Sequence, residues 1–196
     1  MIENKFDTQG FVYIESLLDE STVSIVSEYF ENRMKRGEWL ERTDQNGDLT
    51  TKLCYYADPL IEVLLKAVKP DVEKACGKEL ETSYSYARIY QPGESLLPHL
   101  DRPACEFSVT VSVAYKGEPS PIYMQYLDHD PVKFTLKPGC AVVYKGCETT
   151  HWRRAVKEDC LVVQFMLHYV EKNGINKEYM LDGRAGLGYP SIKRKI

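Results

Sequence analysis

Two of the chain's four histidines and one aspartate have the types and spacing of metal ligands. His99 and Asp101 are separated by one residue, and His151 follows much further along the chain. Side chains at i and i+2 of an extended segment project to the same side, so one strand end can present His99 and Asp101 together. Two neutral imidazoles and one hard carboxylate on one face of a cation leave positions open for further ligands, the arrangement of ferrous sites that react with dioxygen. The motif therefore predicts an iron(II) site.

The residues around this motif strengthen the prediction, because a His-x-Asp pair alone is a weak signal. Tyr90-Gln91-Pro92-Gly93 precedes it, and Lys137-Pro138-Gly139 precedes an apolar run that starts at Ala141 and leads towards His151. In this order of motifs the stretch 83–170 resembles the iron(II)- and 2-oxoglutarate-dependent oxygenase superfamily, particularly its prolyl-hydroxylase-like branch, with a looser similarity at 10–18.

The resemblance implies a mainly β fold with flanking helices, a double-stranded β-helix of the jelly-roll or cupin-like type. It implies that His99, Asp101 and His151 are the catalytic iron ligands and that Tyr90 contacts the oxo acid. The expected activity is that of a dioxygenase that uses iron(II), the cosubstrate 2-oxoglutarate and O2, and releases succinate and CO2. The expected outcome is hydroxylation of a protein side chain of the prolyl type, with a free amino acid or another small molecule as the alternative substrate.

The chain departs from the family where the far carboxylate of the oxo acid is gripped. The family's usual Lys or Arg follows the distal histidine, but the corresponding stretch here is Cys160-Leu161-Val162. A carboxylate inside a barrel must be paired with a cation. Arg153 lies two residues past His151 and shares its side of a strand, so it is the favoured anchor. Arg88, which shares the side of Tyr90 by the same count, is the second candidate.

Three further polar residues allow several readings. Arg102 follows Asp101 directly and could orient that carboxylate, receive a substrate carboxylate, or form a salt bridge at the rim. His168 lies among apolar neighbours, which favours a hydrogen-bonded core histidine over a metal ligand. Gln164 could add a hydrogen bond to the oxo acid, without charge.

Helical periodicity dominates the first part of the chain. Apolar residues at helical spacing predict a helix over 20–36, capped by Asp19 or Ser21, and a second helix over 59–76 that Pro70 must break or kink and Gly77 ends. From Glu81 the pattern changes to short alternating runs, which predict strands at 83–90, 107–115, 121–126, 132–136, 141–145 and 161–170. The two helices are expected to pack on the outer face of one sheet.

Length and composition favour one domain over residues 1–196. The chain has 196 residues, 43% of them hydrophobic, and this is enough for a core. Within the domain we expect helical support over 1–80, the β-helix over 81–170, and a C-terminal tail over 171–196 that forms a loop or is mobile.

Charge and cysteine usage limit the partners and the compartment. A net charge of -4 gives no general nucleic-acid affinity, and the apolar runs are too short to cross a membrane. The six cysteines include no Cys-x-x-Cys pair, and the first residues lack a signal peptide's apolar segment, so a cytoplasmic protein with reduced thiols is expected. The oligomeric state stays open.

Two readings from other classes compete with the oxygenase. A cupin-like barrel could bind a metal or another ligand without oxygenase activity, but such sites commonly use more histidines than the two in this motif. A degenerate oxygenase fold could serve as an interaction module, and the missing downstream cation keeps that reading open. Substrate identity depends on loop residues, and their sequence does not specify a substrate.

Overall fold

A computed structural model describes residues 5–37 and 53–189. The α-helices are α1 (Lys5–Gln9), α2 (Glu20–Lys35), α3 (Pro59–Ala67) and α4 (Lys69–Cys76), and the 3-10 segments are η1 (Pro103–Cys105) and η2 (Lys177–Gly183). The strands are β1 (Phe11–Ile14), β2 (Leu53–Tyr56), β3 (Leu80–Tyr90), β4 (Leu96–His99), β5 (Phe107–Lys116), β6 (Ile122–Tyr126), β7 (Val132–Phe134), β8 (Ala141–Lys145), β9 (Thr149–Arg153) and β10 (Leu161–Glu171).

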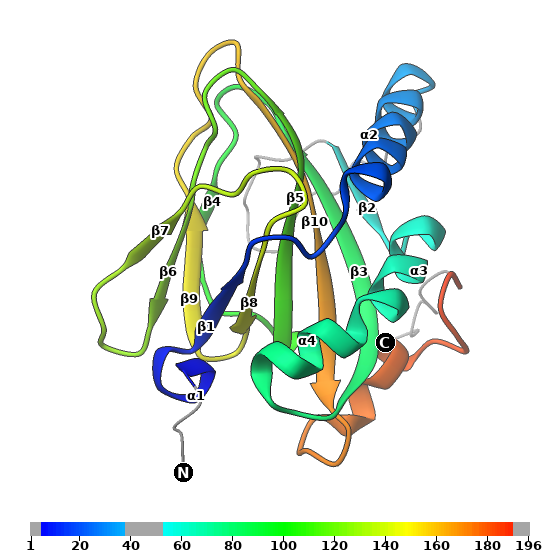
Figure 1. Ribbon diagram of the computed structural model, residues 1–196, viewed down its shortest axis with the longest axis vertical. Helices are drawn as coiled ribbons and strands as arrows, with labels where there is room; N and C mark the ends of the chain where they lie inside the picture. Colours follow the sequence, from blue (N-terminus) through cyan, green and yellow to red (C-terminus); the bar gives the residue numbers. More distant parts are fainter. Residues whose placement is uncertain (1–4, 38–52, 190–196) are drawn as a thin grey trace, which may run out of the picture.

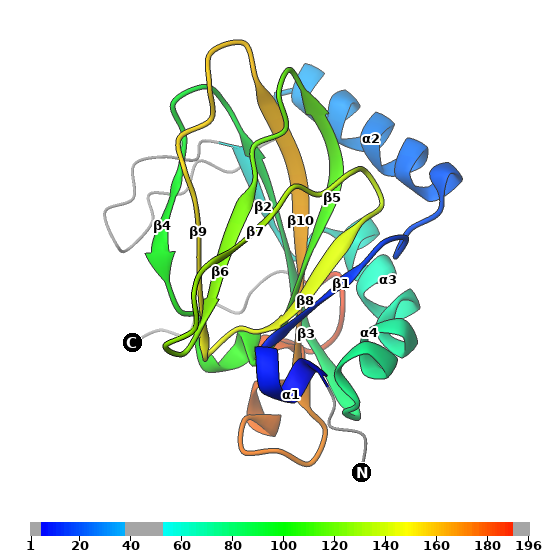
Figure 2. The same cartoon turned by 60° about the vertical axis from the view of Figure 1, so that its left-hand side comes forward.

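The strands form two antiparallel sheets that face each other. The larger sheet has the order β1-β8-β5-β10-β3-β2 and the smaller sheet the order β4-β9-β6-β7. Figures 1 and 2 show three layers, in which the helices α2, α3 and α4 cover one face of the larger sheet and the smaller sheet faces the other. The predicted double-stranded β-helix and the predicted packing of the helices are therefore confirmed.

Apolar and more polar residues alternate along the strands of the larger sheet, so its two faces differ in polarity. In β5 the valines alternate with small hydroxyl residues, and in β10 apolar residues alternate with more polar ones. Because successive side chains of a strand point to opposite faces, one set packs against the helices and the other faces the smaller sheet. The set in the helix-facing core includes Val109, Val111, Val113, Val163, Phe165 and Leu167. The opposite set, which includes Ser108, Thr110, Gln164 and His168, is buried beside the space between the sheets.

The helices begin and end where their capping residues require. The Asp19 carboxylate accepts the Thr22 amide at the start of α2, so the first predicted helix is confirmed with Asp19 as its cap. The second predicted helix is divided at Val68 into α3 and α4. Pro70 lies in the first turn of α4, where a missing amide hydrogen costs least. Gly77 ends α4 with a φ of 71°, a left-handed conformation that suits glycine.

The predicted strands agree with the structure apart from shifts of a few residues at their ends. The short elements α1 and β2 are not anticipated by the sequence patterns. The segment after Glu171 differs from the expected loop or mobile tail, because η2 packs against β3 and the Arg184 side chain is buried. Residues 190–196 of that tail lie outside the described part of the chain. Among the described residues, none of the helices combines the length and apolarity that crossing a membrane requires.

Candidate metal centre

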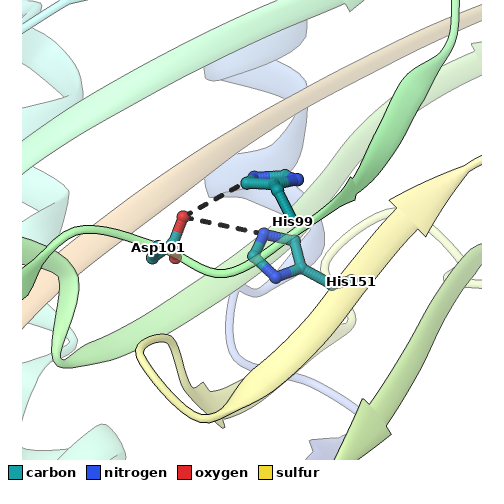
Figure 3. A group of neighbouring side chains, drawn as sticks. All are labelled: His99, Asp101 and His151. Carbon is teal, nitrogen blue, oxygen red and sulfur yellow. Dashed lines mark ion pairs between the residues drawn. The ribbon is translucent and has the colours of Figure 1, made fainter. Parts of the chain in front are cut away.

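The pairing of β4 with β9 brings the two histidines of the motif together. His99 is directly opposite His151 in this antiparallel pair, and the centroids of the two rings are 4.2 Å apart. Asp101 lies just past the end of β4, where its amide donates to the Gly146 carbonyl at 2.9 Å in the turn between β8 and β9. Figure 3 shows the Asp101 carboxylate facing both imidazoles.

The potential ligand atoms converge on one point. Oδ1 of Asp101 lies 3.8 Å from Nε2 of His99 and 3.7 Å from Nε2 of His151. One ligand atom from each of the three residues lies within 4.8 Å of the others. The structure thus brings together the three residues that the motif predicts as ligands, from one strand end and its neighbouring strand.

Hydrogen bonds at the far side of each ring hold the histidines in the tautomer that a metal requires. Nδ1 of His99 lies 2.8 Å from the Leu97 carbonyl, and Nδ1 of His151 lies 3.0 Å from the Thr149 carbonyl. A carbonyl only accepts, so each Nδ1 carries the hydrogen and each Nε2 directs a lone pair towards Asp101. Burial lowers the pKa of His151, which favours the neutral form. This donor set fits a divalent cation.

The three residues line a cavity of about 310 Å³ between the two sheets. Tyr90 and Arg88, both from the inner face of β3, lie on its wall. The guanidinium carbons of Arg88 and Arg153 lie 4.9 and 5.0 Å from the centre of the Tyr90 ring. Both candidate anchors therefore lie next to Tyr90, and Arg88 lines the same cavity as His99 and His151.

Arg153 is buried next to this cavity. Its guanidinium donates to the Ser120 carbonyl and, at 2.5 Å, to Oε1 of Gln164, and it lines a smaller neighbouring cavity. Burial lowers the pKa of Arg153, and within residues 5–37 and 53–189 it has no ion pair with a carboxylate. Arg153 points into the interior, as strand parity predicts, and Gln164 lines both cavities.

Arg102 forms a salt bridge, one of the three roles that the sequence allows for it. Its two terminal nitrogens each lie 2.8 Å from a carboxylate oxygen of Asp182, in the C-terminal segment. Its guanidinium carbon lies 4.7 Å from the centre of the Tyr84 ring, and its side chain lines the cavity. The pair therefore ties the residue after Asp101 to η2.

Two residues next to Asp101 have no role in the sequence motif. The Ser108 hydroxyl lies 2.9 Å from Oδ2 of Asp101. A Cβ atom added to Gly146 would lie 2.0 Å from the Cys105 carbonyl oxygen and 2.8 Å from Oδ2 of Asp101. The alternation of valine and hydroxyl residues in β5 is the sequence signal that places Ser108 on the inner face. The requirement for glycine at position 146 depends on packing between distant segments and leaves no local signal.

Gly146→Ala is expected to destabilise the fold by about 1–3 kcal/mol, because the new methyl group meets backbone that cannot move freely. It should also weaken divalent-cation binding by displacing Asp101. Thermal denaturation and a Co2+ titration measure the two effects. Gly186→Ala is the matched control, because its added Cβ would only touch the Tyr189 ring at 3.4 Å. Wild-type stability of Gly146→Ala would show that the Cys105 carbonyl moves aside easily.

Comparisons with known proteins find similarity at the level of structure. No family model matches the chain, and no curated protein sequence does either. A prolyl-4-hydroxylase from Pseudomonas putida superposes with a TM-score of 0.66 at 18% identity, over 84% of this chain and 95% of that one. A prolyl hydroxylase from Trichoplax adhaerens, solved with a peptide of hypoxia inducible factor, superposes with a TM-score of 0.72 at 13% identity, over 94% and 92%.

A third neighbour was solved with two small molecules. EctD from S. alaskensis, solved with 2-oxoglutarate and 5-hydroxyectoine, superposes with a TM-score of 0.65 at 15% identity, over 91% of this chain and 81% of that one. Sequence identities this low support a shared fold but not a residue-by-residue correspondence. The chain therefore has the double-stranded β-helix fold of the iron(II)- and 2-oxoglutarate-dependent oxygenases, prolyl hydroxylases among them.

Proposed function

We propose that the chain is an iron(II)- and 2-oxoglutarate-dependent dioxygenase that hydroxylates a protein side chain or a small molecule and releases succinate and CO2. The observation that carries the proposal is the convergence of His99, Asp101 and His151 on one point of a cavity whose wall includes Tyr90 and a cation. The shared fold supports the same reaction type.

Iron would be held by Nε2 of His99, Oδ1 of Asp101 and Nε2 of His151. When bound, it would supply the activation of dioxygen and the oxidative decarboxylation of the oxo acid. The chain's own part is orientation and charge. The carbonyls of Leu97 and Thr149 fix the two rings, and the Asp101 carboxylate offsets part of the cation's charge. His151 is only 3% exposed, so its ring is shielded from bulk water.

The far carboxylate of 2-oxoglutarate would be paired with Arg153, next to Tyr90. A buried guanidinium favours an anionic partner, and the partners of Arg153 among the described residues are the Ser120 carbonyl, the Gln164 amide oxygen and the Tyr90 side chain, none of them a carboxylate. An oxo acid bound at the metal and extending along Tyr90 would supply that charge. Arg88, on the cavity wall, is the second candidate, and the two guanidiniums could share one carboxylate.

Arg153→Ala is expected to raise the apparent requirement for 2-oxoglutarate by about tenfold or more, because breaking a buried charge-assisted pair costs roughly 2–5 kcal/mol. Cation affinity should change little. Titration of succinate release against 2-oxoglutarate measures the effect. Arg154→Ala, an exposed neighbour on the other side of the chain, is the matched control. If Arg88→Ala alone raises the requirement, the anchor is Arg88, and if neither variant does, 2-oxoglutarate is not the cosubstrate.

The first candidate substrate is a side chain presented by a protein or peptide, with a small molecule as the alternative. A cavity of about 310 Å³ is at the small end for ligand sites, so it suits a small reacting group whose remaining bulk stays outside. Leu97 and Leu100, on either side of His99, are exposed and could contact that bulk. A cytoplasmic location belongs to the same proposal.

The direct test is anaerobic absorption spectroscopy of the iron(II)-loaded chain with and without 2-oxoglutarate. An oxygenase should develop a weak visible charge-transfer band when the oxo acid binds the iron. A cupin-like barrel without oxygenase activity would bind the metal without that band, and an interaction module would bind neither. If the band forms, a succinate-release screen over peptides and small molecules identifies the substrate class.

A further inference from the structure

The side of Asp101 that faces away from the two histidines belongs to a second polar cluster. One potential ligand atom from each of Asp101, Cys105 and His168 lies within 4.8 Å of the others. The Ser108 hydroxyl lies inside this group, 2.9 Å from Oδ2 of Asp101 and 2.9 Å from Nδ1 of His168. Ser108 thus links a predicted metal ligand to a histidine that the sequence motif does not use.

The direction of these hydrogen bonds follows from counting hydrogens. Ser108 has one hydroxyl hydrogen, and the Asp101 carboxylate and the Cys105 carbonyl, at 3.1 Å, can only accept it. The bond to the charged and closer Asp101 is the stronger one. The Ser108 oxygen then presents a lone pair to His168, so Nδ1 of His168 must carry a hydrogen and donate it. The chain of bonds runs from His168 through Ser108 to Asp101.

Neighbouring strands position the residues of this hydrogen-bonded series. Ser108 on β5 is directly opposite His168 on β10, and both point to the inner face of the larger sheet. Ser108 is fully buried, and the His168 ring packs against Tyr84 with the ring centroids 4.5 Å apart. Burial and this packing favour the hydrogen bonds among His168, Ser108 and Asp101 over bonds to water.

We propose that Ser108 and His168 are positioning residues of the metal centre, which hold the Asp101 carboxylate with Oδ2 bound to Ser108 and Oδ1 free to face His99 and His151. The inference rests on the proposed function, because it concerns the same metal. It assigns a role to two buried polar residues of the larger sheet, neither of which is one of the three predicted ligands.

The alternative is that Asp101, Cys105 and His168 bind a second cation. Two observations disfavour it. The Cys105 sulfur lies 3.1 Å from the Tyr84 hydroxyl, and burial raises the pKa of the Cys105 thiol well above its usual range, whereas a metal requires the thiolate. The Ser108 hydroxyl already links Asp101 to His168. One cation per chain is therefore expected.

Calorimetric titration with Co2+ in the absence of 2-oxoglutarate tests the inference without depending on activity. Ser108→Ala should weaken Co2+ binding by about 10–100-fold, the usual loss when a hydrogen-bond partner of a ligand is removed. His168→Asn and His168→Leu have similar size, but only asparagine keeps an N–H group near the position of Nδ1. His168→Asn should therefore bind Co2+ more tightly than His168→Leu, and the visible absorption of the bound Co2+ should differ between them. Ser112→Ala, buried on the same strand, is the matched control.

Each outcome decides a separate point. Wild-type Co2+ affinity in Ser108→Ala overturns the positioning role, and equal affinities in His168→Asn and His168→Leu remove His168 from it. A stoichiometry of two in the wild type that falls to one in His168→Leu establishes the second cation site instead. A wild-type chain that binds no Co2+ contradicts the proposed function itself. Ser108→Ala removes one atom, so it keeps the test decisive if the histidine variants do not fold.

Discussion

Asp101→Ala is expected to abolish succinate release and to weaken divalent-cation binding by more than about 100-fold, while the β-helix stays folded. Within residues 5–37 and 53–189, Asp101 is the carboxylate that lies near both histidines, so its loss removes the charge that offsets the cation as well as one of three ligands. The loss should exceed the 10–100-fold that removal of an indirect partner costs. His99→Ala and His151→Ala should abolish turnover for the same geometric reason.

The fold should tolerate the change, because in the absence of metal Asp101 is a partly desolvated carboxylate without an ion-paired Lys or Arg among the described residues. Co2+ calorimetry, succinate release and near-ultraviolet circular dichroism measure the three expectations. Asp130→Ala, which changes an exposed aspartate in a loop, is the control for loss of one negative charge. Wild-type turnover of 2-oxoglutarate by Asp101→Ala would contradict the metal site.

The residues around Asp101 show which parts of a site can be read from sequence. His99, Asp101 and Arg153 were identifiable because strand parity is a local rule, and the structure orients each of them as parity predicts. Ser108 follows the same rule, since it alternates with the valines of β5. A motif search overlooks it because a serine in a strand has no ligand chemistry of its own.

The remaining features depend on contacts between segments far apart in the chain, which local patterns do not encode. Gly146 is required to be small because the Cys105 carbonyl lies against it. Strand parity directs both Arg153 and Arg88 inward, and they differ only in their contacts with distant segments, where Arg153 binds Ser120 and Gln164 beside Tyr90. The C-terminal segment has no periodic pattern, so sequence suggests a loose tail where the structure has a packed one.

That segment is held by an ion pair between Arg184 and Glu62 of α3. Nη2 of Arg184 lies 2.6 Å from Oε1 of Glu62, and the two side chains are 0% and 1% exposed. Arg184 also donates to the Ser83 carbonyl of β3 at 2.9 Å, and the Gly188 amide donates to Glu62. The pair therefore joins a helix, the larger sheet and the chain's C-terminal part at one buried point.

Arg184→Met is expected to lower the free energy of unfolding by about 3–5 kcal/mol, because it leaves the Glu62 carboxylate buried without its cation. Glu62→Leu should cost a similar amount for the converse reason. The double variant should cost clearly less than the sum, since neither charge is then left alone. Urea denaturation of the four proteins completes the cycle. Glu118→Ala, which breaks an exposed pair with Lys157, should leave stability close to that of the wild type.

The same variants reach the metal centre through the C-terminal segment. Asp182 lies two residues before Arg184 and accepts hydrogen bonds from Arg102, next to Asp101, and from Tyr56. Release of the segment in Arg184→Met should therefore expose 177–189 to limited proteolysis and loosen the cavity wall at Arg102. Because Asp101 keeps its own bonds to Ser108 and Gly146, Co2+ affinity should fall far less than stability does. If Arg184→Met instead unfolds with wild-type stability, solvent reaches Glu62 once the segment is loosened, and the segment contributes little to the fold.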